Sequence, residues 1–290
     1  MRLEGMPAGH RLRYGPAAEG IERLEASLVG VAFSPHRHDT YAIGVTLAGV
    51  QTFRYRGESR HCLPGEWHVL HPDEVHDGAA GTGDGFGYRI FYIDPALVQE
   101  ALGGAPLPFV ADPVIRGRGV PASLAARLAG LDEPLDGFAR VEVGVLVAGM
   151  LARYGSAQHG SAQHGSAQHG SARYGSARYG RRGPLPMAAL ARVRELIASD
   201  PVVRRPVEEF ERVAGLDRWT IARQFRAAYG TSPTRFRTMR QLDLVRRLLL
   251  AGTPAREAAV AAGFADQAHM TRMFKRAYGR TPAAWRAALP

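Results

Sequence analysis

The sequence predicts a multidomain α+β protein, in which an N-terminal β-barrel and its following helices precede an all-α C-terminal domain with two helix-turn-helix modules. Three observations predict it: short strand-like runs separated by turn residues, a low-complexity repeat in the middle, and a duplicated helical pattern at the end. We therefore expect four regions, namely a barrel at 1–120, a helical packing or dimerisation segment at 121–154, a flexible linker at 155–183 and a double helix-turn-helix domain at 184–290.

The barrel is expected from strand-like runs at 41–47, 51–56, 66–70 and 87–93. Glycine and proline punctuate these runs at Gly49, Gly57, Pro64-Gly65 and Pro72, a spacing typical of all-β sandwiches and barrels. From residue 121 the period becomes helical, and a segment at 138–154 has apolar residues on more than one face. That segment needs a packing partner, which is either the barrel or another subunit.

The linker is expected from exact repetition. SAQHG occurs three times from Ser156 to Gly170, and SARYG follows twice up to Gly180. Glycine, serine and alanine at this density cannot bury enough surface to offset the entropy of ordering. The repeat places histidines at His159, His164 and His169, but a five-residue spacing is poor for convergence on one metal ion, so we favour tandem duplication of the coding DNA.

Charge is divided unevenly along the chain. Residues 187–290 carry a net charge of +10, whereas residues 1–150 carry −5. A basic C-terminal third beside an acidic N-terminal half is expected of a protein that binds nucleic acid phosphates. A single cysteine and an N-terminus without an apolar run favour a cytoplasmic, nucleoid-associated protein with no membrane partner.

The C-terminal region contains a diverged repeat. Residues 221–237 align with 270–286 at an offset of 49, and seven of the 17 positions are identical. Each unit has an apolar helical face that stops at a glycine, Gly215 or Gly263, and a capping aspartate that starts a second helix, Asp217 or Asp266. In the second unit Thr253 is expected to cap the first helix, with Pro254 at its first position. A single long helix at 235–250 would hold the two units apart.

The second helix of each unit can enter a major groove, which makes its outward residues the expected DNA contacts. These are Arg218, Trp219, Thr220, Ala222, Arg223 and Arg226 in the first unit, and Gln267, Ala268, His269, Thr271, Arg272, Lys275 and Arg276 in the second. Arginine can donate two hydrogen bonds to guanine, and alanine and threonine methyls suit thymine. A solvated helix face explains any one arginine, but the equivalent positions of Arg223 and Arg272 favour base contacts. Arg226, Lys275 and Arg276 are expected at phosphates.

These motifs resemble the DNA-binding domain of AraC/XylS-family regulators, from AGLDRWTIARQF through GFADQAHMTRMFKRAYGRTPAAWR. The resemblance implies a homeodomain-like double helix-turn-helix, with base-facing positions at Trp219, Ala222, Arg223, Ala268, Thr271 and Arg272. It also implies a transcriptional regulator, most often an activator.

The N-terminal region resembles the cupin-type sensor domain of the same family, on the residues Pro35-His36-Arg-His38, Pro64-Gly65 and Pro72-Asp-Glu-Val-His76. From alternation and position we expect a ligand pocket lined by His36, His38, Tyr41, Trp67, His76 and Arg89. Enzymatic cupins bind a metal with a His-x-His pair, a carboxylate and a later histidine. Residues 40–46 contain no carboxylate, so we expect no metal, no cofactor and no catalysis.

The favoured function is therefore a ligand-responsive regulator that binds double-stranded promoter DNA, as a homodimer, and answers to a small-molecule effector. RNA polymerase is a possible further partner. Two alternatives remain open: a metal-dependent cupin enzyme with a DNA-binding tail, and an architectural DNA binder with a vestigial barrel.

Overall fold

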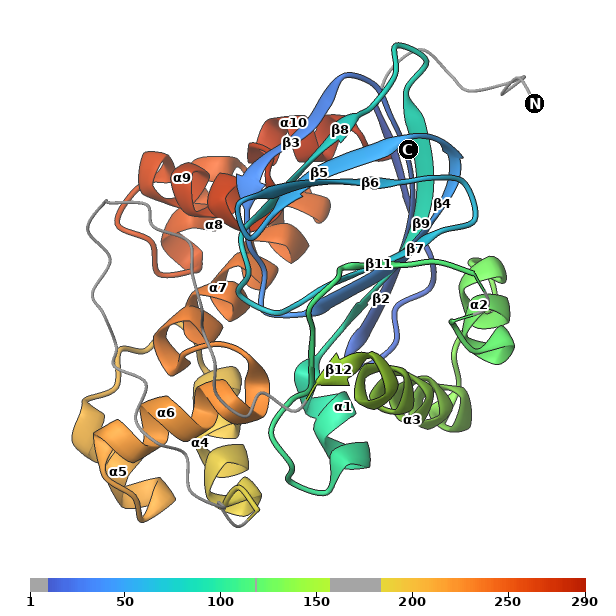
Figure 1. Ribbon diagram of the computed structural model, residues 1–290. Coiled ribbons are helices and arrows are strands. Elements are labelled where there is room, and N and C mark those ends of the chain that lie inside the picture. The colour runs from blue at the N-terminus through green and yellow to red at the C-terminus, as the bar shows by residue number, and fades with distance from the viewer. Residues whose placement is uncertain (1–9, 118, 157–183) are drawn as a thin grey trace.

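The computed structural model describes residues 10–117, 119–156 and 184–290. The linker expected at 155–183 lies outside the described residues, except for Gly155 and Ser156. Two antiparallel β-sheets with helices along one side form the N-terminal part, and seven helices form the C-terminal part (Figure 1). The expected α+β class is thereby confirmed.

The two sheets face each other across a common interior. The six-stranded sheet has the order β1 (Arg11–Tyr14), β2 (Ile21–Leu28), β9 (Phe86–Ile93), β4 (Tyr41–Gly49), β7 (Trp67–Leu70) and β11 (Val114–Ile115). The four-stranded sheet has the order β3 (Val31–His36), β8 (His76–Ala80), β5 (Gln51–Tyr55) and β6 (Glu58–Cys62). A short pair joins β10 (Phe109–Val110) to β12 (Gly155–Ser156).

Three helices cover the outer face of the larger sheet: α1 (Pro95–Leu102), α2 (Ala122–Ala129) and α3 (Gly137–Tyr154). Alternate strand residues such as Ile43 and Phe91 are buried there against Leu97, Val143 and Val147. Because side chains alternate along a strand, their neighbours point into the space between the sheets. This alternation decides which side chains of the larger sheet reach the space between the two sheets.

The C-terminal helices form two modules joined by α7 (Pro233–Leu250). The first module comprises α4 (Met187–Ser199), α5 (Val207–Ala214) and α6 (Arg218–Tyr229), and the second comprises α8 (Ala255–Ala261), α9 (Gln267–Tyr278) and α10 (Pro282–Ala287). The expectation of one long connecting helix is confirmed. At about 1.5 Å per residue, its 18 residues span roughly 27 Å.

The expected helix starts are confirmed at two of three positions. Asp217 and Asp266 cap α6 and α9 by accepting backbone N–H groups. The expectation for α8 is wrong, because Pro254 is itself the N-cap residue and no side chain caps the helix. Pro254 has extended geometry, with ψ at 140°, so α8 begins one residue later.

The second module and the interior of the two-sheet domain share one apolar cluster. Leu28, Phe53 and Phe86 between the sheets belong to the same buried cluster as Leu242 of α7 and Phe274 of α9. Backbone hydrogen bonds also cross the boundary, from Leu12 N to Ala288 O at 2.8 Å and from Ser34 N to Gly279 O at 3.0 Å. The two parts are therefore packed together and are not merely tethered.

Candidate DNA-binding surface and ligand cavity

The first recognition helix, α6, exposes most of its expected DNA contacts. Arg218, Trp219, Ala222, Arg223 and Arg226 are exposed, and Thr220 is half-buried. Trp219 is a large side chain with 72% of its surface exposed, so it is accessible to a binding partner.

Arg218 is engaged within its own module. Glu211 accepts hydrogen bonds from the backbone N and the Nε of Arg218, both at 2.9 Å. These hydrogen bonds hold the pKa of the Glu211 carboxyl below its ordinary value. The positive charge of Arg218 is therefore less available to DNA than that of Arg223, whose one hydrogen bond to the described residues is to the hydroxyl of Thr220 at 3.3 Å.

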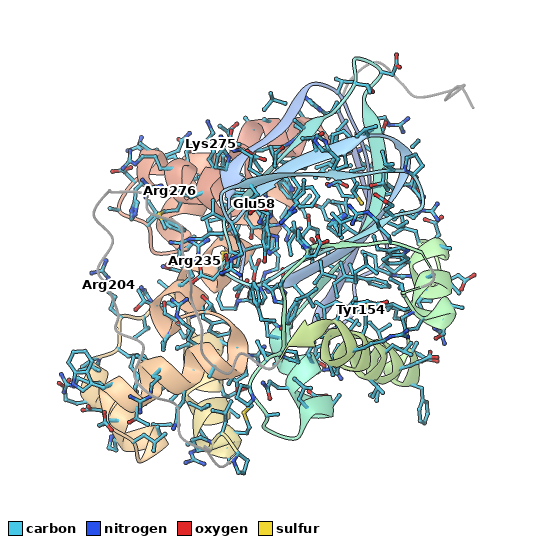
Figure 2. The ribbon with its side chains drawn as sticks, viewed as in Figure 1. Glu58, Tyr154, Arg204, Arg235, Lys275 and Arg276 are labelled. Carbon is cyan, nitrogen blue, oxygen red and sulfur yellow. The ribbon has the colours of Figure 1, made fainter. Side chains whose placement is uncertain are left out.

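The second recognition helix, α9, shows the same arrangement. Gln267, Ala268, Arg272, Lys275 and Arg276 are exposed, whereas His269 and Thr271 are half-buried. Figure 2 shows Lys275 and Arg276 on α9, and Arg235 where α7 faces the two-sheet domain. The expected DNA contacts of both modules thus lie on accessible helix faces.

The opposite ends of both recognition helices lie against the sensor domain, which the sequence did not indicate. Gly230 ends α6 beside Pro72, and a Cβ atom on Gly230 would lie 2.7 Å from Pro72 Cβ. Gly279 ends α9 beside His36, and a Cβ atom there would lie 2.8 Å from His36 Nδ1. Equivalent glycines of the two repeats therefore make equivalent close approaches to the sensor.

Ion pairs reinforce this boundary. Asp73, between β7 and β8, lies 3.3 Å from Arg226 of α6 and 3.2 Å from Arg235 of α7. Asp39 lies 2.9 Å from Arg240 of α7. Burial raises the pKa of Asp39 to about 6, although Arg240 opposes that shift. The sequence did not indicate this role for either aspartate, since it depends on partners about 150 to 200 residues away in the sequence.

A cavity of about 1420 Å³ lies between the sheets and opens onto the C-terminal helices. Sensor residues that line it include His36, His38, His68, His76, Tyr88 and Tyr92. Its other wall includes Arg194, Arg240, Arg246, Tyr278 and Trp285 of the C-terminal domain. A molecule in this cavity would therefore contact both domains.

Three expected pocket residues are not in the cavity. Tyr41 and Trp67 are buried in the cluster on the outer face of the larger sheet. Arg89 pairs with Glu25 at 2.6 Å and donates to Ala129 O at 2.7 Å, beside α2. These assignments were wrong because the three residues occupy the alternate positions of β4, β7 and β9 whose side chains point to the outer face of the larger sheet. The inward neighbours, His68, Tyr88 and Tyr92, were missed although the same alternation could have identified them.

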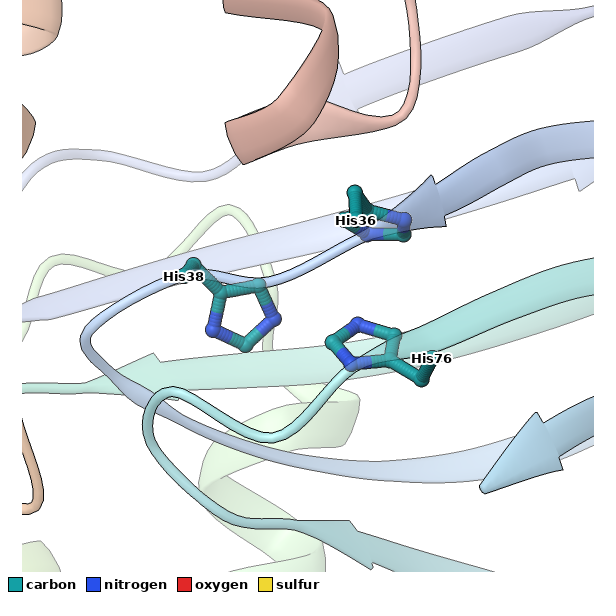
Figure 3. A group of neighbouring side chains, drawn as sticks. All are labelled: His36, His38 and His76. Atoms are coloured by element: carbon teal, nitrogen blue, oxygen red, sulfur yellow. The ribbon is translucent and has the colours of Figure 1, made fainter. Parts of the chain in front are cut away.

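The remaining expected pocket residues, His36, His38 and His76, lie together at the ends of β3 and β8 (Figure 3). One ring nitrogen from each lies within 4.8 Å of the others. Burial lowers the pKa of all three imidazoles, to about 4 for His76, and nearby cationic groups lower those of His36 and His38 further. All three rings are therefore neutral near pH 7.

The comparisons with known proteins match both parts of the chain. Residues 20–142 match the family model of the AraC-like ligand binding domain, and residues 211–288 match a model of a helix-turn-helix domain. Over 100 residues the chain is 32% identical to the HTH-type transcriptional regulator RipA of Corynebacterium glutamicum. That alignment covers 34% of this chain and 30% of RipA, so it spans less than a third of the relative.

Solved structures of ToxT from Vibrio cholerae resemble the whole molecule. One has a TM-score of 0.60 at 10% identity and covers 93% of this chain and 99% of ToxT. Another, of ToxT bound to an unsaturated fatty acid, has a TM-score of 0.58 at 10% identity and covers 98% and 96%. At this identity the likeness is one of fold. In the described parts of the chain, no helix combines the length and apolar character needed to cross a bilayer.

Proposed function

Because this chain is a member of the AraC family of transcriptional regulators, with a ligand-binding domain and a helix-turn-helix domain, we propose that a small molecule in the interdomain cavity controls its binding to promoter DNA. The observation that carries the proposal is the composition of the cavity wall. Sensor residues such as Tyr92 and DNA-binding-domain residues such as Arg240 line one space. An effector there changes the contacts of both domains, which is the differential interaction that a shift between two states requires.

The two recognition helices are the proposed DNA contacts. Arg223 and Arg272 are assigned to base edges, with Trp219, Ala222, Ala268 and Thr271 beside them. Arg226, Lys275 and Arg276 are assigned to phosphates, and the remaining positions, Arg218, Thr220, Gln267 and His269, flank these contacts. The α7 helix supports a fixed separation of the modules, which suits successive major-groove faces on one side of a duplex.

The cavity favours an effector with both polar and apolar groups. Imidazoles and the phenols of Tyr88 and Tyr92 line its inner part. The guanidinium of Arg246 lies over the rings of Tyr14, Tyr278 and Trp285, at 5.3 to 5.5 Å from their centroids. The fatty acid bound by ToxT supports an organic ligand of this general kind.

A second copy of the chain is the proposed partner of α3. Phe138, Val141 and Val145 of this helix are 90%, 49% and 54% exposed, and their spacing places them on one side of the helix. Pairing through this side would bring two DNA-binding domains together and raise their effective concentration on adjacent half-sites. We further propose that the protein is cytoplasmic and that, when it activates transcription, it contacts RNA polymerase.

Binding of the full chain to its own genomic targets tests the DNA assignment. Fragments recovered by crosslinking and immunoprecipitation would be measured by fluorescence anisotropy against a shuffled duplex, over a range of salt concentrations. We expect tighter binding to the recovered fragment and affinity that falls steeply with salt. Equal affinity for both duplexes, or no salt dependence, would refute sequence-specific DNA binding.

A further inference from the structure

We propose that His36, His38 and His76 form a three-histidine site for a divalent transition-metal ion of the zinc, copper, nickel or iron class. The three residues come from the end of β3, the loop after it and the start of β8. One ligand nitrogen from each lies within 4.8 Å of the other two, and all three side chains are buried. Figure 3 shows the three rings grouped around a common space.

The backbone fixes the rings in the tautomer that a metal requires. The Nδ1 of His36 lies 2.9 Å from Ser34 O, and those of His38 and His76 lie 3.0 Å from Thr40 O and Glu74 O. A carbonyl oxygen can only accept, so each Nδ1 carries the proton and donates it. Each Nε2 is then left with a free lone pair. Histidines that bind metals usually donate their other ring nitrogen to a carbonyl or carboxylate in this way.

At least one of these lone pairs has no other use within the described part of the chain. The Nε2 of His38 is buried and has no hydrogen-bond partner among the described residues. A buried acceptor without a partner costs free energy. A bound cation would satisfy this nitrogen of His38 and could also be coordinated by His36 and His76.

The donor set decides the class of ion. Three neutral imidazoles suit zinc, copper, nickel and iron(II), whereas magnesium and calcium prefer oxygen ligands. The missing carboxylate argued against a metal at the level of sequence. In the structure the three histidines lie on the wall of the cavity, so the fourth position can be filled by water or by an oxygen donor of a cavity ligand.

The site is directly connected to the contacts that hold the DNA-binding domain. Asp39, which pairs with Arg240, follows His38 in the chain, and Gly279 at the end of α9 packs on the ring of His36. Asp73, which pairs with Arg226, lies in the same loop as the residues leading to His76. A bound ion would fix β3, β8 and both loops relative to one another. That the ion acts as an effector or co-effector rests on the proposed function, whereas the site itself does not.

Metal titration of the untagged full chain tests the site. Chelator-treated protein would be titrated with Co²⁺, followed by its visible absorption, and then with Zn²⁺ in competition. We expect one equivalent per chain and loss of that equivalent in both His38→Gln and His76→Gln, each checked for folding by circular dichroism. Two independent variants guard against a failure of either one to fold.

The matched control removes the other histidine cluster of the sequence. A triple variant, His159→Gln, His164→Gln and His169→Gln, is expected to bind one metal ion per chain, as the wild-type protein does. The site is refuted if wild-type protein binds no stoichiometric metal, if the triple variant loses it, or if both single variants keep it.

Binding to a genomic DNA target with and without Zn²⁺ separates the two proposals. A change in DNA affinity that His38→Gln abolishes supports the effector role. Metal binding with unchanged DNA affinity refutes the effector role, while the proposal of a three-histidine metal site still holds. Failure of the metal-free and metal-loaded chain alike to bind DNA refutes the proposed function, again leaving the site.

Discussion

The carboxylate of Asp73 lies 3.3 Å from the guanidinium of Arg226, an exposed cation on the first recognition helix. Asp73 is only 4% exposed at its side chain and has a φ of 63°, in the left-handed region that asparagine and aspartate tolerate best. In this arrangement the sensor domain partly neutralises a cation that is assigned to DNA phosphate. The contact is therefore an electrostatic competitor of DNA.

Asp73→Asn is expected to tighten DNA binding in the absence of an effector. Asparagine keeps the turn conformation but releases Arg226. An ion pair with one exposed partner is worth about 0.5–1 kcal/mol, so we expect affinity to rise by about two- to five-fold. Fluorescence anisotropy at low salt measures the change. Glu58→Gln, which removes the same charge from an exposed site on β6, is the matched control and should alter affinity less. Weaker binding by Asp73→Asn would contradict the competition.

Alanine at three glycines that end helices of the DNA-binding domain, Gly215 of α5, Gly230 of α6 and Gly279 of α9, is expected to destabilise the protein by different amounts. Gly215, Gly230 and Gly279 all have φ near +70°, so alanine costs about 1–2 kcal/mol of backbone strain at each. At Gly215 nothing lies within 4 Å of the added Cβ, whereas at Gly230 and Gly279 it meets sensor atoms. A further cost of about 1–3 kcal/mol is expected at those two. Urea unfolding that ranks Gly215→Ala as the most damaging of the three would contradict the packing described.

Base and phosphate contacts are expected to separate by their dependence on sequence. Arg223→Ala and Arg272→Ala should each cost about 1–3 kcal/mol on a genomic target and little on shuffled DNA. Lys275→Ala should weaken binding to both duplexes and reduce the salt slope by roughly one. If Arg272→Ala weakened both duplexes equally, Arg272 would be a phosphate contact instead.

Val145→Glu on α3 is expected to convert a dimer into a monomer, because it places a charge in the middle of the proposed subunit interface. Sedimentation velocity over a range of concentrations measures the effect. Val260→Glu on α8 is the matched control, since Val260 is also an exposed valine, with 64% of its surface accessible. A wild-type chain that stays monomeric at all concentrations would exclude this interface.

Stability is expected to fall as the pH is lowered from about 6.5 towards 4. Burial lowers the pKa of His71 to about 4 and that of His68 to about 3, from an ordinary value of 6.5. Between these values the unfolded chain binds more protons than the folded chain, so acid favours unfolding. Each histidine contributes up to about 1.4 kcal/mol per pH unit. His71 also accepts a hydrogen bond from Val110 N at 3.1 Å, which protonation would remove.

Urea unfolding at several pH values checks this expectation. His71→Gln should reduce the slope by up to about 1.4 kcal/mol per pH unit, because the other buried histidines still contribute, whereas His61→Gln, at an exposed position on β6, should leave it unchanged. An equally steep dependence in His71→Gln would show that His71 does not carry the effect.

Local patterns were sufficient to predict most of the C-terminal domain. The helix end at Gly215 and the caps at Asp217 and Asp266 depend on backbone groups only two to four residues away, so the sequence predicts them well. The failure at Thr253 is local too, since one proline can serve either as the cap or as the first helical residue.

The sensor cavity was harder to predict because polar residues occupy both faces of its strands. Val45 is the register partner of both Trp67 and Arg89, so all three share the outer face, one residue out of phase with His68 and Ile90. The histidine pair and His76 were correctly expected to lie at the pocket wall, since each belongs to a turn-flanked motif. The interdomain pairs of Asp39 and Asp73 depend on the tertiary arrangement alone.

The apolar cluster shared by the sensor interior and the second helix-turn-helix module limits how such regulators can be recombined. A chimera that joins this sensor to a foreign DNA-binding half would leave Leu28 and Phe53 facing side chains of the wrong shape in place of Leu242 and Phe274. New pairings of signal and promoter are therefore more accessible through substitutions on the exposed faces of α6 and α9 than through the exchange of whole domains. In this protein the choice of operator can evolve independently of the apolar interface between the two domains, whereas the residues on both sides of that interface must change together.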